Sequence, residues 1–139
     1  MKLIKFLLKW YLLTLLTLIL ILYLTFFKPV GHMPKVNIAW LDKAAHFVMY
    51  FTLCAVFWFE TLRITLRPRP FLMVLLAVVM PILFSGLMEY LQYRLTSYRT
   101  GDFADFLFNT IGVFVALLFS ILVTKPCLVR FRNCRLHGK

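Results

Sequence analysis

A histidine and three acidic residues could carry out acid–base chemistry in this sequence. Asp42 lies four residues before His46, and this spacing places both on one face of a helix, where the carboxylate can orient the imidazole. Glu89 and Asp105 add two more carboxyl groups. With His46 as the general base and Glu89 or Asp105 as the acid, such a set could hydrolyse or transfer a group. The candidate catalytic residues are therefore His46, Asp42, Glu89 and Asp105.

Five further polar residues could bind a ligand. Guanidinium groups hold phosphate or carboxylate with two hydrogen bonds, and amides add directional contacts. Asn109 is too deep in its segment to cap a helix, so it needs an interhelical hydrogen bond or a ligand. Structural alternatives stay open, because Asp102 could cap a helix and Arg94 or Arg99 could neutralise Glu89. The candidate binding residues are Gln92, Arg94, Arg99, Asp102 and Asn109.

The segments that position these residues are apolar enough to cross a membrane. Of the 139 residues, 63% are hydrophobic, which excludes an ordinary soluble domain. A helix of about 20 apolar residues crosses the roughly 30 Å of hydrocarbon in a bilayer. We therefore expect an all-α membrane protein with a single transmembrane domain, residues 1–139. The four predicted transmembrane helices are residues 6–27, 44–62, 71–93 and 103–124, followed by a basic tail, 125–139.

The distribution of charge predicts how these helices are oriented. The chain carries a net charge of +11. Its basic residues gather before the first span, between the second and third, and after the fourth, which places both termini in the cytoplasm by the positive-inside rule. We interpret the positive excess as a topology signal and expect no nucleic-acid partner. The predicted orientation brings all the candidate site residues to the outer face.

Helical spacing arranges the polar residues in three stripes. Because a charged side chain that faces lipid at mid-bilayer costs about 2.5 to 3.5 kcal/mol, we expect the stripes to face one another around a polar pocket at the outer face. Gly112 and Ala116 would let the fourth helix approach a neighbour closely, and Pro81 should kink the third. The stripes are Asp42, His46 and Tyr50; Pro81, Ser85, Glu89 and Gln92; and Asp102, Asp105, Asn109, Gly112 and Ala116.

The sequence predicts neither a cofactor nor a metal site. Cys54 lies within a span, while Cys127 and Cys134 fall in the tail, so we expect no disulfide framework. No nucleotide-binding glycine loop, nucleophile elbow or His-Glu-x-x-His motif is present. A divalent ion held by His46, Glu89 and Asp105 is an alternative that no dedicated ligand spacing supports.

Three short motifs together resemble a known family. They are DKAAHF at 42–47, EYLQ at 89–92, and DFADFLFNTIG at 102–112, which follows Arg99. In order and spacing they resemble the VanZ-like family of bacterial membrane proteins, over residues 40–122. The resemblance implies a multi-pass protein of the bacterial cytoplasmic membrane that acts in the cell envelope. The founding member is associated with low-level resistance to the glycopeptide teicoplanin, but the family has no settled reaction or substrate.

Two functions fit these residues. In the first, a noncatalytic protein binds membrane lipids and an amphiphile, such as a lipid-linked cell-wall intermediate or a lipoglycopeptide, and contributes to teicoplanin-type tolerance. In the second, a membrane-embedded hydrolase or transferase acts on a phospholipid or glycolipid at the outer leaflet, using His46 and the acids. A proton-coupled transporter fits less well, because no ionisable relay reaches the cytoplasmic side. Catalysis, ligand identity and oligomeric state stay open.

Overall fold

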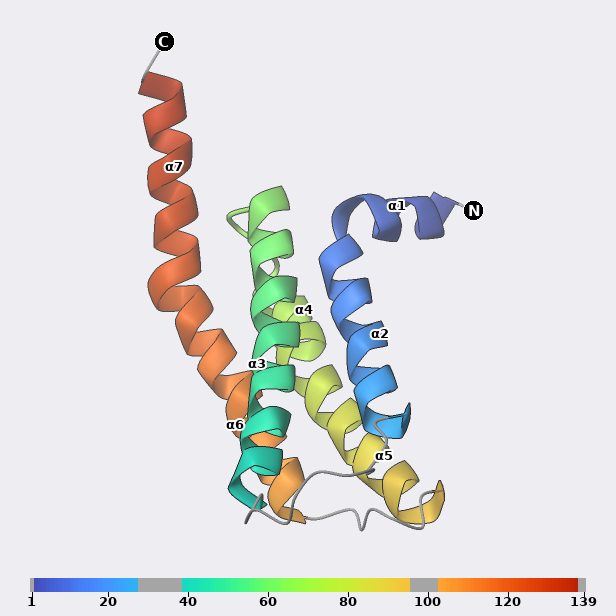
Figure 1. The fold of residues 1–139 in the computed structure, drawn as a ribbon. Coiled ribbons are helices and arrows are strands. Elements are labelled where there is room, and N and C mark those ends of the chain that lie inside the picture. The colour runs from blue at the N-terminus through green and yellow to red at the C-terminus, as the bar shows by residue number, and fades with distance from the viewer. Residues whose placement is uncertain (1, 28–38, 96–102, 138–139) are drawn as a thin grey trace.

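The fold is a bundle of helices (Figure 1). A computed structural model describes residues 2–27, 39–95 and 103–137, and this part of the chain contains helices and no strands. The prediction of an all-α protein is confirmed. The elements are α1 (Lys2–Trp10), α2 (Leu12–Phe27), α3 (Ala39–Ile64), α4 (Pro70–Val74), the π-helical turn η1 (Leu75–Val79), α5 (Met80–Leu95), α6 (Phe103–Phe119), the π-helical turn η2 (Ser120–Thr124) and α7 (Lys125–His137).

Within the described ranges, three helical stretches are long and apolar enough to cross a membrane. They are Trp40–Ile64, Pro70–Leu95 and Phe103–Cys134, and they contain the last three segments that the sequence predicts as spans. The third is continuous through α6, η2 and α7, so α7 extends well past the rest of the bundle in Figure 1. Their length and hydropathy identify a membrane protein.

The first predicted span, 6–27, is wrong as a single helix. The chain bends at Tyr11, and α1 lies across the end of α2 in Figure 1. The remaining apolar helix, α2, has 16 residues and is therefore about 24 Å long, which is shorter than a typical hydrocarbon core. No proline or glycine accounts for the bend, so its cause must lie elsewhere in the molecule.

The bend is stabilised by the Glu60 side chain of α3. Its carboxylate accepts hydrogen bonds from the backbone N–H groups of Leu13 and Thr14, at 3.0 and 3.1 Å, and from the Thr14 hydroxyl at 2.7 Å. The first backbone N–H groups of a helix have no partner within that helix, and its N-terminal end attracts negative charge. Glu60 therefore caps α2 from a neighbouring helix.

A side chain from a neighbouring helix also bonds a backbone group at the C-terminal end of α2. Gln92 of α5 donates a hydrogen bond from its side-chain amide to the backbone carbonyl of Thr25, at 3.2 Å. This carbonyl is one of the last four of α2, which have no partner further along the helix. Side chains from α3 and α5 thus fix both ends of the shorter helix.

Both π-helical turns precede a proline. The η1 turn ends two residues before Pro81, and η2 ends two residues before Pro126. Proline lacks the N–H that would bond the carbonyl four residues earlier, and its ring crowds that carbonyl. In each case the N–H of the residue before the proline reaches five residues back, from Met80 to Leu75 and from Lys125 to Ser120. The irregularity predicted at Pro81 is therefore a widened turn.

The closest packing is between α3 and α6, which make the most extensive contact between elements. A Cβ atom added to Gly112 would lie 2.6 Å from the Phe47 carbonyl oxygen and 3.0 Å from the Phe51 nitrogen, so only glycine fits there. This bears out the close approach predicted for the fourth span. The adjoining core contains Tyr50, Cys54, Val78, Val113 and Ala116.

Candidate functional site

Four buried polar side chains meet at one end of the bundle. His46 lies in the second turn of α3, Glu89 in the second half of α5, and Asp105 and Asn109 in the first two turns of α6. All four are at most 9% exposed. We call these four residues the polar cluster. It lies at the lower end of Figure 1, where α3 and α6 begin and α5 ends.

His46 is the centre of the polar cluster. Its Nδ1 lies 3.2 Å from the Asn109 side-chain oxygen and 3.6 Å from Glu89 Oε1, and its Nε2 lies 3.7 Å from Asp105 Oδ2. The Asn109 amide nitrogen donates to Ser85 Oγ at 2.8 Å and to Glu89 Oε1 at 3.4 Å, so its oxygen faces His46. His46 Nδ1 is consequently the donor to Asn109, and Nε2 is the nitrogen that can gain or lose a proton.

The surroundings of Asp105 add charge of both signs. Lys43 Nζ lies 3.5 Å from Asp105 Oδ1. Asp42, half-buried, joins the same group, because Asp42, His46 and Asp105 each place one potential ligand atom within 4.8 Å of the others. With Glu89, the described residues at this end bring three carboxyl groups near one lysine and one histidine. Carboxylates accept hydrogen bonds and attract cations, so this set suits a bound cation or a ligand that donates hydrogen bonds.

The three grouped donors could hold a metal ion. One imidazole nitrogen and two carboxylate oxygens from Asp42, His46 and Asp105 suit a divalent transition ion such as zinc or manganese. Lys43 competes with such an ion for Asp105. The sequence predicts no metal site, and the alternative set left open there has Glu89 in the place that Asp42 takes in this group.

Not every predicted site residue takes part in the cluster. Gln92 is buried and bonds α2, and Arg94 is exposed at the end of α5. Within the described residues, Glu89 forms no ion pair with Arg94, and its contacts include His46 and Asn109. The two remaining candidates, Arg99 and Asp102, lie outside the described residues.

Sequence reasoning missed two charged residues. Lys43 is not among the candidate site residues, yet it contacts Asp105. Its position three residues before His46, on the same helix face, was the available signal. Glu60 is not among the candidate residues either, and its contacts with α2 follow only from the tertiary structure.

An apolar cavity lies deeper in the bundle than the polar cluster. It has a volume of about 260 Å³, and its lining residues nearest in sequence to the cluster are Leu53, seven residues after His46 on α3, and Phe84, five residues before Glu89 on α5. The predicted pocket was polar, whereas this cavity is almost entirely apolar. Its walls come from α2, α3, η1 and α5, through Thr14, Leu18, Leu53, Cys54, Phe57, Leu76, Met80, Pro81 and Phe84.

The long apolar helices and the buried polar cluster define a helical membrane protein with ionisable groups gathered at one end. The sequence profile described as VanZ/LLP1 matches residues 9–124, and the chain therefore belongs to the VanZ/LLP1 family. The match includes α2, which the three short motifs did not cover. No curated protein and no solved structure matches the chain.

Proposed function

We propose that this protein binds a lipid-linked amphiphile, whose head group reaches the polar cluster while part of its chain occupies the deeper apolar cavity. The observation that carries the proposal is the succession of two unlike environments along α3 and α5: buried ionisable side chains, and, about two turns deeper on α3, an apolar space of about 260 Å³. An amphiphile presents the same two environments in the same order.

The charge of the cluster favours a head group rich in hydroxyl groups. Carboxylates accept hydrogen bonds, so Glu89 and Asp105 suit sugar hydroxyls better than they suit phosphate. A phosphate would instead lie nearer the surface, where Lys43 and the exposed Arg94 supply positive charge. A lipid-linked cell-wall intermediate, with a sugar, a phosphate and a prenyl chain, has all three parts. A lipoglycopeptide shares the sugars and the acyl chain.

The cellular setting is part of the same proposal. The family and the distribution of lysine and arginine support a multi-pass protein of the bacterial cytoplasmic membrane, with the polar cluster on the outer side. In Figure 1, α1 and α7 both lie at the end away from the cluster, as two cytoplasmic termini would require. Binding of lipoglycopeptides there would contribute to teicoplanin-type tolerance.

A second candidate function is hydrolysis or group transfer on such a lipid. It is favoured by the position of His46, with one ring nitrogen held by Asn109 and the other 3.7 Å from Asp105. An imidazole oriented in this way can act as a general base, with Glu89 as the acid. Water, a substrate hydroxyl or a metal ion at Asp42, His46 and Asp105 would have to supply the nucleophile.

Binding and turnover can be measured on one set of variants. The full chain, purified in neutral detergent, is titrated with a polyprenyl-pyrophosphate disaccharide and with the same prenyl phosphate lacking the sugar. We expect the wild type to prefer the disaccharide, and His46→Gln to bind it about tenfold more weakly. If His46→Gln keeps its affinity for the disaccharide lipid but no longer releases a product from it, the enzyme function is favoured instead.

Glu60→Gln is the matched control, because it alters a buried carboxylate outside the polar cluster. It should reduce stability without changing affinity for the disaccharide lipid. Equal affinity of wild type for the two prenyl lipids, or equal loss of binding in His46→Gln and Glu60→Gln, would contradict the proposal.

A further inference from the structure

Two buried hydrogen-bonding groups lack partners at the opposite end of the bundle. They are the indole N–H of Trp58 on α3 and the hydroxyl of Ser120, the first residue of η2. Trp58 is 8% exposed and Ser120 is fully buried. Among the described residues, neither group has a hydrogen-bond acceptor or donor within reach. A buried polar group without a partner within the protein is costly, and such groups are typical of sites where a ligand supplies the hydrogen bond.

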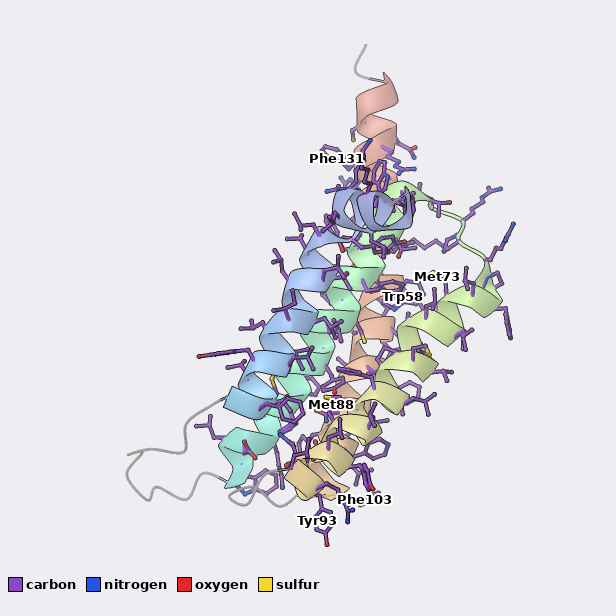
Figure 2. The ribbon with its side chains drawn as sticks, turned by 90° about the vertical axis from the view of Figure 1, so that its right-hand side faces the viewer. Trp58, Met73, Met88, Tyr93, Phe103 and Phe131 are labelled. Carbon is purple, nitrogen blue, oxygen red and sulfur yellow. The ribbon has the colours of Figure 1, made fainter. Side chains whose placement is uncertain are left out.

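The two residues that carry these groups, Trp58 and Ser120, line the same cavity. Its volume is about 400 Å³, within the range of about 300 to 1,000 Å³ typical of small-molecule sites. Figure 2 shows Trp58 and Met73 close together, and they pack in one apolar cluster with Leu62 and Ala77. The cavity also borders η2, the turn that Pro126 widens.

The charged residues of this cavity are basic. Arg67 and Lys125 line it, and both are exposed, whereas no acidic residue is part of its lining. The nearest buried acid on α3, Glu60, is hydrogen-bonded to α2. The cavity therefore offers positive charge at its rim and an apolar interior, with two hydrogen-bond donors between them.

The depth of these features matches a phospholipid. Trp58 lies six residues before the end of α3, which is about 9 Å along the helix axis, and Ser120 lies five residues, about 7 Å, before Lys125. A phosphate at Arg67 and Lys125 would place the glycerol ester carbonyls at the level of Trp58 and Ser120. The acyl chain would then follow the apolar wall of Leu62, Met73, Val74, Leu117 and Ile121.

We propose that this cavity is a specific site for an anionic phospholipid. The phosphate pairs with Arg67 and Lys125, and the ester carbonyls accept hydrogen bonds from the Trp58 indole N–H and the Ser120 hydroxyl. The site is separate from the polar cluster, and it does not depend on the function proposed there. It would fix the end of α3 and the start of α7 to one lipid molecule.

Native mass spectrometry of the full chain in neutral detergent tests the proposal. The probes are phosphatidylglycerol, phosphatidylcholine with the same acyl chains, and glycerol 3-phosphate. We expect phosphatidylglycerol to bind about tenfold more tightly than phosphatidylcholine, and glycerol 3-phosphate not to be retained. Trp58→Phe with Ser120→Ala should weaken phosphatidylglycerol binding about tenfold. Arg67→Gln with Lys125→Gln should remove the preference between the two phospholipids.

Two control variants match these changes outside the cavity. Trp40→Phe alters an exposed tryptophan, and Arg130→Gln removes a positive charge from α7. Neither should change binding. Equal binding of the two phospholipids, tight binding of glycerol 3-phosphate alone, or equal losses in control and cavity variants would overturn the proposal.

A fluorescence measurement covers the case in which the double variants fail to fold. In a Trp10→Phe, Trp40→Phe background, Trp58 is the remaining tryptophan. Phosphatidylglycerol with brominated acyl chains should quench its emission more strongly than brominated phosphatidylcholine at the same mole fraction. Equal quenching by the two lipids would contradict a specific anionic site.

Discussion

Two buried glutamates in neighbouring helices have unlike partners. Glu60 accepts hydrogen bonds from two backbone N–H groups and one hydroxyl of α2. Glu89 lies beside the His46 ring and the Asn109 amide, which come from two other helices. Backbone donors belong to the fold and cannot be exchanged for a ligand, whereas side chains such as His46 can change protonation or rotate. Burial of a carboxylate therefore does not indicate function, but the kind of partner does.

Gly112→Val should cause the largest loss in the free energy of unfolding. The added side chain separates α3 from α6 and so disrupts the polar cluster. It leaves the contact between Glu60 and α2 in place. The added side chain would overlap the Phe47 backbone, and overpacking of this kind costs about 3 kcal/mol. Reversible unfolding in mixed micelles measures the loss.

Gly86→Ala is the control for that variant, because its added Cβ would lie at an ordinary 3.5 Å from the Phe106 ring. Alanine is favoured over glycine within a helix, so the free energy of unfolding should be unchanged or higher by less than about 1 kcal/mol. A loss as large as that of Gly112→Val would show that close packing at Gly112 is not the cause.

Glu60→Ala should cause the next largest loss in the free energy of unfolding. It leaves the N–H groups of Leu13 and Thr14 without an acceptor, at an expected cost of about 2 kcal/mol in the free energy of unfolding. Hydrogen exchange should rise at the start of α2 before it rises in α3. If affinity for the disaccharide lipid falls as well, the distinction between the two glutamates is wrong.

Gln92→Leu should cause the smallest of these losses in the free energy of unfolding. The sequence predicts that Gln92 binds a ligand. In the structure Gln92 instead bonds the Thr25 carbonyl and so stabilises one end of α2, as Glu60 stabilises the other. Loss of one hydrogen bond should lower the free energy of unfolding by about 1 kcal/mol with little change in ligand affinity. Weaker binding of the disaccharide lipid at unchanged stability would instead indicate that Gln92 contacts the ligand.

Periodicity within each helix predicted much of the polar cluster, since residues three or four apart on one face point the same way. His46 and Tyr50, Ser85 and Glu89, and Asp105 and Asn109 follow this rule, and all six are buried.

The bend at Tyr11 could not be predicted, because the acid that stabilises it is 46 or more residues away from the groups it caps. No local breaker marks the position. The same holds for the bond from Gln92 to Thr25, which spans 67 residues. Contacts of this kind are set by which helices become neighbours, and a single sequence does not encode that in any local pattern.

A double-mutant cycle in ligand affinity is the most direct test of the central claim. It asks whether the residues of the polar cluster contribute to binding together and whether Glu60 contributes independently of them. Affinity for the polyprenyl-pyrophosphate disaccharide is measured for His46→Gln, Asp105→Asn, Glu60→Gln and the two double variants that contain His46→Gln. We predict a coupling of at least about 1 kcal/mol between His46 and Asp105, and additivity within about 0.5 kcal/mol between His46 and Glu60. Additive losses at His46 and Asp105, or equal coupling in both pairs, would contradict the account.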